Sequence, residues 1–173
     1  MIYNERQDRR ERALAAAKLM MTAARTAPKG KGMDIIEVAI ADGNDIIRIS
    51  EALGRMAVEM QLPFMTRDSA NVLLADAILL IGTARHEHGL NCGHCGFDTC
   101  GEKPASALCA LNTVDVGIAT GSAASVAADL RVDTRVMFSA GLAAQRLGML
   151  GEAMMAIAMP VSISSKNPFF DRA

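Results

Sequence analysis

All four cysteines of this 173-residue chain lie in one short segment, residues 86–109. They are Cys92, Cys95, Cys100 and Cys109, with the spacing C-x2-C-x4-C-x8-C. Cysteines that only fill a core are expected to be scattered as separate small hydrophobes, so this concentration indicates a shared ligand. Four thiolates in one loop suit a tetrahedral metal ion or an iron–sulfur cluster, because both need soft anionic donors.

The spacing of the cysteines favours an iron–sulfur cluster. Structural zinc sites usually pair two C-x2-C knuckles across a longer gap, and this chain has one such knuckle. The plant-type ferredoxin run has the same two short gaps in the opposite order, so the match is not to that class. Gly93, Gly96 and Gly101 allow positive φ and bring backbone amides close to sulfur atoms. Zinc stays open as an alternative, as do disulfides or unliganded thiols.

Three histidines lie in or beside the cysteine segment, at His86, His88 and His94. Four cysteines already complete a ligand set, so the histidines are expected to be solvated loop side chains.

The composition indicates one globular domain spanning residues 1–173. Hydrophobic residues make up 51% and charged residues 21%, which is enough apolar material for a core. The net charge of −1 and an aromatic content of 3% without Trp give no basis for nucleic-acid binding. The charged N-terminus does not resemble a secretory signal, and no apolar run approaches the roughly 20 residues of a membrane span. A cytoplasmic protein is expected, where clustered cysteines bind metal more readily than they form disulfides.

Hydrophobic periodicity and turn residues predict interleaved helices and strands. The segments 33–41 and 77–83 are predicted to be strands. The strand at 77–83 leads directly into the cysteine segment. A late strand at 154–164 contains Pro160, which indicates an edge position or an early end to the pairing. The adjacent Phe169 and Phe170 indicate a docked tail. Helices are expected at 4–27, from Asn44 or Asp45 to about 62, from Thr66, at 111–130 and from Asp133 or Thr134.

Two glycine-containing segments have both an ordinary and a functional interpretation. Residues 29–32, KGKG, form either a solvated turn or an anion site, because lysines and free glycine amides suit a phosphate. Gly117 and Gly121 each cost a helix roughly 1 kcal/mol relative to alanine. That cost indicates close approach of another helix, or of a flat cofactor.

Four runs of the chain resemble one known family. They are CGHCGFDTC, VDVGIATGSA, VDTRVMFSAGLAAQRLGML and MPVSISSKNPFFDR. They resemble the bacterial and archaeal proteins described as uncharacterised proteins containing a ferredoxin domain, over nearly the whole chain. The resemblance implies an iron–sulfur protein with a [4Fe-4S] cluster on Cys92, Cys95, Cys100 and Cys109. It implies no particular reaction, because the family is named for its cluster.

The order of elements is also similar to that of the flavin-dependent nitroreductases. The shared order is a helix ending in AARTAP, a strand, a long helix, a second strand, small-residue helices and a final strand with a basic tail. This resemblance implies a single α+β domain with helices packed on a small mixed sheet, and residues 86–109 as a cysteine-rich insertion. In that family the loop after the Ala-Pro pair, here Ala27 and Pro28, helps to bind FMN.

If FMN is bound, its phosphate is expected near cations and its ring against the small-residue face. The candidates are Arg25, Lys29, Lys31, Lys166 and Arg172 for the phosphate, and Gly117 and Gly121 for the ring. The nitroreductase resemblance and the small helices also favour a homodimer with cofactors near its interface.

The sequence therefore predicts an intracellular redox protein whose cluster passes single electrons, with a partner protein or a small molecule as electron donor. A flavin-dependent oxidoreductase is one form of this hypothesis. The alternative is a structural metal, zinc or iron–sulfur, in a scaffold or interaction protein without catalysis.

Overall fold

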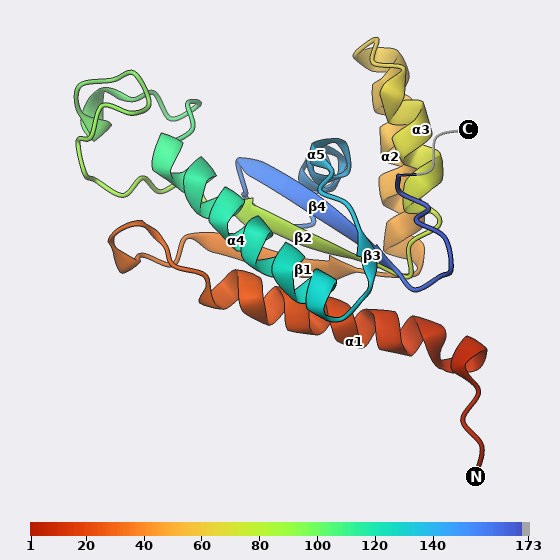
Figure 1. Ribbon diagram of the computed structural model, residues 1–173. Coiled ribbons are helices and arrows are strands. Elements are labelled where there is room, and N and C mark those ends of the chain that lie inside the picture. The colour runs from red at the N-terminus through yellow and green to blue at the C-terminus, as the bar shows by residue number, and fades with distance from the viewer. Residues whose placement is uncertain (171–173) are drawn as a thin grey trace.

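The computed structural model describes residues 1–170, which form a four-stranded sheet with helices on both faces (Figure 1). The strand order is β1-β2-β4-β3. The strands are β1 (Ile36–Ala41), β2 (Ala77–Thr83), β3 (Asp133–Thr134) and β4 (Met155–Ser162). The helices are α1 (Glu5–Thr26), α2 (Asn44–Glu59), α3 (Phe64–Val72), α4 (Ala110–Asp129) and α5 (Phe138–Arg146), with 3-10 turns at Gly30–Gly32 and Cys100–Glu102.

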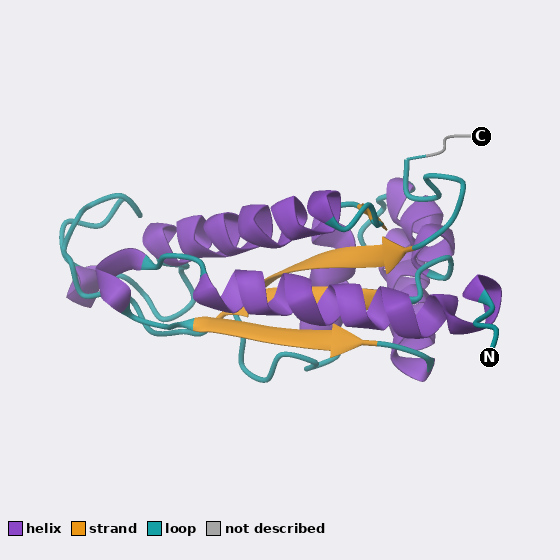
Figure 2. Cartoon of the chain, turned by 60° about the horizontal axis from the view of Figure 1, so that its bottom comes forward, coloured by secondary structure: helices purple, strands orange, loops and turns teal. Residues whose placement is uncertain are grey.

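The α+β architecture expected from the sequence is confirmed, with two separate layers of helices. The long helices α1 and α4 lie side by side on one face, where Ser122 Oγ donates to Ala23 O at 2.9 Å (Figure 2). Helix α5 lies on the other face against β4 and β2, and α2 and α3 pack against α5 toward one end of the sheet (Figure 1). Alternate residues of β2 enter the two cores: Leu79 and Ile81 face α1 and α4, whereas Ile78 and Leu80 face the other layer. All seven residues of β2 are buried, as a central strand requires.

The sheet and its last strands differ from the expectation in two ways. Every strand pair in the described part of the chain is antiparallel, so the sheet is not mixed. Residues 133–134 pair with β4 instead of starting a helix, and Met137 bridges to Ala158, so α5 begins only at Phe138. Strand β4 is not at the edge of the sheet, but its pairing with β3 covers two residues and ends before Pro160.

The C-terminal tail is docked against the body of the protein up to residue 170, the last described residue. Phe169 is fully buried in the core beneath α2, α3 and α5. Arg135 donates to Phe169 O at 2.8 Å, and its guanidinium lies 5.3 Å from the centre of the Phe170 ring. The burial of Phe169 confirms the docked tail. Arg172 lies outside the described residues.

One end of the sheet carries the cysteine segment. The pairing register places Ile36, Thr83 and Met155 together at this end. From there, residues 84–109 extend away from the body of the protein, on the left of Figure 1. Among the described helices, none combines the length and the apolarity that crossing a membrane requires.

Candidate metal centre

The four cysteines meet at one small hollow in the protruding loop. Cys92, Cys95, Cys100 and Cys109 all line it, together with Phe97 and Lys103 among others. All four are free thiols. Cys109 is buried, Cys95 and Cys100 are half-buried, and Cys92 is exposed. The loop thus surrounds a common space and leaves one rim open to solvent.

Positive-φ residues fold the loop around this hollow. Asn91, Gly93 and Gly96 have φ values of 49°, 72° and 86°. A Cβ at Gly93 or Gly96 would meet no atom within 4 Å, so the backbone conformation, and not lack of space, favours glycine there. The Gly96 amide donates to Gly93 O at 2.9 Å and closes a tight turn between Cys92 and Cys95.

Asn91 connects the two halves of the loop. Its Oδ1 accepts from the Cys100 amide at 2.8 Å, and its own amide donates to Cys100 Sγ at 3.4 Å. Amide hydrogen bonds of this kind stabilise a sulfur that carries negative charge, and they are one way in which proteins tune metal–thiolate centres. The sequence had not singled out Asn91.

Two positive groups lie beside the thiols. The Lys103 side chain is only 4% exposed, and its Nζ lies 3.9 Å from Glu87 Oε2 and donates to Ala107 O at 3.0 Å. Cys109 is the N-cap residue of the 20-residue helix α4, so its sulfur lies near the positive end of the helix dipole. Both features place positive charge beside the hollow that the four cysteines line.

The two candidate metal centres place different demands on the spacing of the four thiols. Within residues 1–170, no three Cys, His, Asp or Glu side chains are gathered so that they could bind one metal ion. A single zinc ion at about 2.3 Å from each sulfur would need the thiols drawn to within roughly 4 Å of one another. In a four-iron cluster each thiolate binds a different iron, so the sulfurs lie farther apart. The cysteines of the described chain line one hollow, as either centre requires, and their thiols would have to draw closer together to bind a single zinc ion.

A buried histidine–aspartate pair anchors the base of the loop. His88 is 2% exposed, and its Nε2 lies 3.0 Å from Asp115 Oδ2 on α4. The Gly30 amide donates to the same carboxylate, at 3.0 and 3.1 Å from its two oxygens. The expectation of a solvated loop side chain is therefore wrong for His88, whose ring is buried with Nε2 against Asp115 and Nδ1 without a hydrogen-bond partner in the described chain, whereas His86 and His94 are exposed.

Asn112, one turn before Asp115, makes a second attachment. Its Nδ2 donates to His86 O at 2.7 Å. The sequence analysis missed both residues, although a signal was present: Asp115 is the one charged residue between positions 110 and 128, in a helix of small apolar side chains. A single charge in such a helix needs a partner when it is buried.

Replacing Asp115 with alanine is expected to destabilise the protein by about 2 kcal/mol, because His88 Nε2 and the Gly30 amide would both lose a buried acceptor. Urea unfolding followed by circular dichroism measures the change. The matched control is Asp129→Ala, at the exposed end of the same helix, which should shift stability by less than about 0.5 kcal/mol. Equal stability of the two variants would show that the pair does not anchor the loop.

The candidate flavin residues do not come together in one place in the described chain. Arg25, Lys29 and Lys31 lie at the end of the sheet that carries the cysteine loop, whereas Lys166 follows β4 at the opposite end. Arg25 donates to both oxygens of Asp34 at 2.8 and 2.9 Å. Lys29 donates to Arg25 O and to Ala27 O, and lies 3.8 Å from Asp34.

The remaining candidates are exposed. Lys31 is exposed, with Nζ 3.4 Å from His88 O, and the amide of neighbouring Gly30 is occupied by Asp115. Gly117 and Gly121 lie on the outward face of α4, where a Cβ on either would meet no atom within 4 Å. Within the described chain, no second helix packs closely against these glycines.

Comparison with known proteins assigns the chain to a family. A relative from Archaeoglobus fulgidus, described as an uncharacterized protein, is 40% identical over 183 residues that include 100% of this chain and 98% of the relative. A family described as "Uncharacterized protein containing a ferredoxin domain (DUF2148)" matches residues 105–172. This chain belongs to the ferredoxin-domain family. The family match includes only Cys109 of the four cysteines, whereas the alignment with the archaeal relative spans them all.

Solved structures similar to this member of the ferredoxin-domain family have the nitroreductase fold. An FMN-dependent nitroreductase from Clostridium difficile R20291 superposes with a TM-score of 0.60 at 12% identity, over 88% of this chain and 81% of that one. A BluB-like flavoprotein from Clostridium difficile 630 gives 0.59 at 16% identity, over 88% and 81%. The NADPH:FMN oxidoreductase of Vibrio harveyi gives 0.57 at 13% identity, over 92% and 63%. The fold expected from the sequence is confirmed.

Proposed function

We propose that this protein is an iron–sulfur redox protein with a [4Fe-4S] cluster on Cys92, Cys95, Cys100 and Cys109. The observation that carries the proposal is that these four cysteines line one hollow. The ferredoxin-domain family and the flavoprotein-type fold support a redox role in general. The cluster, when bound, supplies a carrier for single electrons.

The chain's own groups would set how readily such a centre accepts an electron. The Asn91 amide at Cys100 Sγ, the buried Lys103 and the N-terminus of α4 all place positive charge beside the sulfurs. Each would therefore favour the more negative, reduced state of a bound cluster and raise its reduction potential. We assign the protein to the reducing cytoplasm, in keeping with its free thiols.

Electron exchange is proposed to take place at the exposed rim of the loop. Cys92 is exposed, and the loop projects away from the sheet (Figure 1). A redox partner protein, or a small electron donor, could approach there without a change in the protein core.

Anaerobic reconstitution with iron and sulfide tests the proposal. About four irons per chain are expected, with a broad absorbance band and an EPR signal on reduction. Colourless protein that binds one zinc per chain under the same conditions would favour the structural-metal alternative and remove the redox assignment.

A second candidate function is a flavin-dependent oxidoreductase acting as a homodimer. It is favoured by the exposed face of α4, where Gly117 and Gly121 leave room for close approach and Val114 and Ile118 are 52% and 40% exposed. The candidate cations lie at opposite ends of one chain, so one FMN phosphate could use both groups only between two copies.

Gly121→Leu tests this arrangement, because a large side chain at that position would keep two α4 helices apart. Sedimentation should report a dimer for the parent protein and a monomer for the variant. The flavin fluorescence released by heating should be lower for the monomeric variant than for the parent. The control Glu51→Leu places leucine on the exposed face of α2, where the dimer should persist. A parent protein that is monomeric and free of flavin would end this second assignment.

A further inference from the structure

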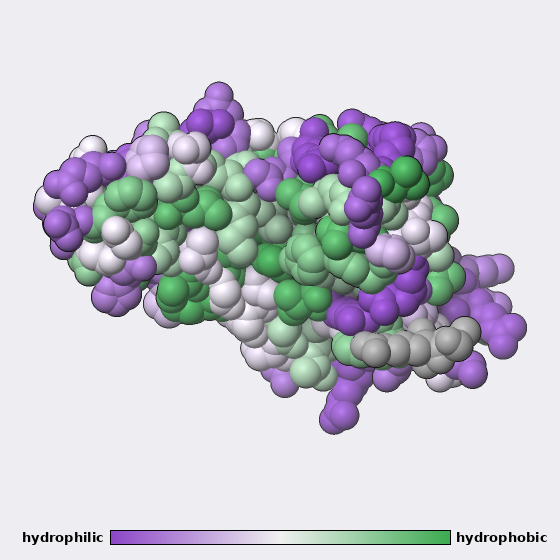
Figure 3. Space-filling model, turned by 90° about the horizontal axis from the view of Figure 1, so that it is seen from above, coloured by the Kyte–Doolittle hydropathy of each residue, from purple (hydrophilic) through white to green (hydrophobic). Residues whose placement is uncertain are grey.

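A large hollow lies beside the base of the cysteine loop, outside the candidate metal centre. It has a volume of about 560 Å³ and is bounded by β1, by the 149–153 turn and by residues 84–86. Small-molecule pockets commonly occupy about 300 to 1,000 Å³, so this hollow is large enough for a metabolite. Seen from above, hydrophobic surface occupies the middle of this face, between hydrophilic groups toward both ends (Figure 3).

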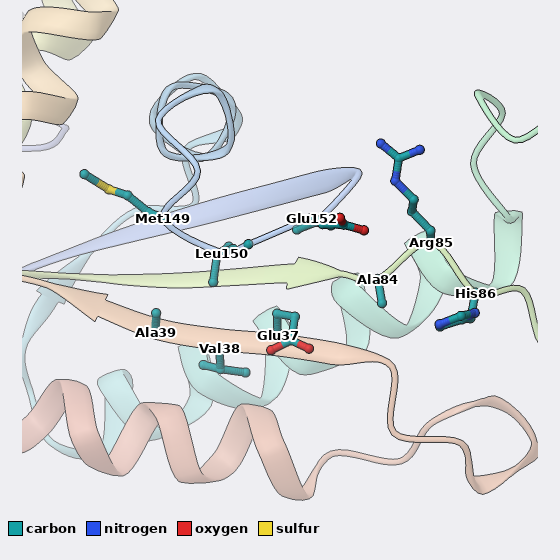
Figure 4. Close-up of a pocket in the computed structure, with 11 residues that line it drawn as sticks. Glu37, Val38, Ala39, Ala84, Arg85, His86, Met149, Leu150 and Glu152 are labelled. Atoms are coloured by element: carbon teal, nitrogen blue, oxygen red, sulfur yellow. The ribbon is translucent and has the colours of Figure 1, made fainter.

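A glycine on β2 fixes one wall of the hollow. Gly82 pairs with Glu37 on one side and Ala156 on the other. A Cβ at Gly82 would lie 2.9 Å from Met155 O and 3.0 Å from Leu150 Cδ1. The 149–153 turn therefore rests directly on the strand, with Leu150 pointing down toward it (Figure 4). The wall is supported by regular structure, as a preformed site requires.

The two ends of the hollow differ in chemistry. Ala39, Met149 and Leu150 provide apolar surface at one end. Glu37, Glu152, Arg85 and His86 lie toward the other end, next to the base of the cysteine loop (Figure 4).

Three charged side chains at this end make no ion pair or side-chain hydrogen bond with other described residues. Among the described residues, Glu37, Arg85 and Glu152 make no ion pair and no side-chain hydrogen bond, although Arg25 is paired with Asp34 and Arg146 with Glu59 elsewhere on the surface. Carboxylates and a guanidinium around one hollow are thus free to meet complementary groups on a ligand.

We infer that this hollow binds a small zwitterion with an apolar side group, that is, a free amino acid with an apolar side chain. Its carboxylate would accept from Arg85, and its ammonium would donate to Glu37 or Glu152. The side group would pack against Met149 and Leu150. A purely anionic ligand would leave two carboxylates unmatched, and a purely cationic one would leave Arg85 unmatched. The site goes beyond the redox function and does not depend on a bound cluster.

Calorimetric titration with three matched probes tests the inference on the full-length protein. The probes are L-phenylalanine, 3-phenylpropionate, which lacks the ammonium, and 2-phenylethylamine, which lacks the carboxylate. Phenylalanine is expected to bind at least about tenfold more tightly than either analogue, because each analogue loses one charge-assisted contact.

Variants assign each end of the ligand. Arg85→Gln should weaken phenylalanine about tenfold and leave 2-phenylethylamine unchanged, whereas Glu37→Gln combined with Glu152→Gln should weaken phenylalanine and leave 3-phenylpropionate unchanged. The controls Arg55→Gln and Glu51→Gln alter exposed charges on α2 and should change nothing.

Three results would each overturn the inference. They are equal affinity for the three probes, affinities that the pocket variants do not change, and no phenylalanine binding at millimolar concentration. The titrations are repeated on Cys100→Ser protein. Retained binding without iron supports a separate site, so failure of the cluster proposal and failure of this one are distinguishable.

Discussion

Cys100→Ser and Cys109→Ser are each expected to abolish the four-iron absorbance and the EPR signal, with iron content after reconstitution falling to a small fraction of the parent's. Serine is a hard, neutral oxygen donor at neutral pH and replaces a thiolate poorly as an iron ligand. Of the two variants, Cys100→Ser should be the more informative test of the ligand assignment, because the Asn91 amide is directed at the Cys100 sulfur.

The same variants separate the redox role from the structural-metal alternative. The loop projects from the end of the sheet, and neither core cluster includes a cysteine. We therefore expect Cys100→Ser to keep its circular dichroism spectrum and to unfold cooperatively. Asp98→Asn, an exposed change in the same loop that does not line the hollow, should retain both fold and iron. A Cys100→Ser protein that retains its iron would refute the ligand assignment, and one that unfolds would favour a structural metal.

Gly141→Ala is expected to lower the free energy of unfolding by at least about 3 kcal/mol, the upper part of the range for overpacked cores. A Cβ on Gly141 would lie 2.2 Å from Ala156 O and 2.7 Å from Ile157 Cα. Both are backbone atoms of β4, so neither can move aside as a side chain could. Helix α5 would have to lift from the sheet.

Gly54→Ala in α2 is the matched control, because a Cβ there would meet only Ser69 Oγ, at 3.9 Å. Alanine is favoured over glycine in a helix by about 1 kcal/mol, so this variant should be slightly stabilised. The urea concentrations at the unfolding midpoints measure both stability changes, provided that the dependence of the unfolding free energy on urea concentration is the same for each variant. If Gly141→Ala is as stable as the parent, the close contact between α5 and β4 is absent in solution.

The sequence predicted the parts of the fold that depend on local patterns. The strand at 77–83 was located correctly, and the expected helices at 4–27 and 111–130 agree with α1 and α4 to within about two residues. The concentration of the cysteines in residues 86–109 also predicted that they lie together, because all four belong to one short segment.

Contacts between distant segments could not be read in the same way. The link from His88 to Asp115 spans 27 residues, and that from Gly30 to Asp115 spans 85. Asp133 and Thr134 read as a helix start, yet their pairing with Val161 and Ser162 overrides that local preference. The hollow beside Arg85 is formed by three separate segments, so no single run of sequence describes it.

The attachment of the loop base to α4 bears on how the proposed cluster would be inserted. Asn112 and Asp115 fasten residues 86–88 through groups that belong entirely to the polypeptide. If the proposed cluster is bound, residues 86–88 would already be held in place before iron and sulfide arrive, so this part of the loop would carry no further ordering cost.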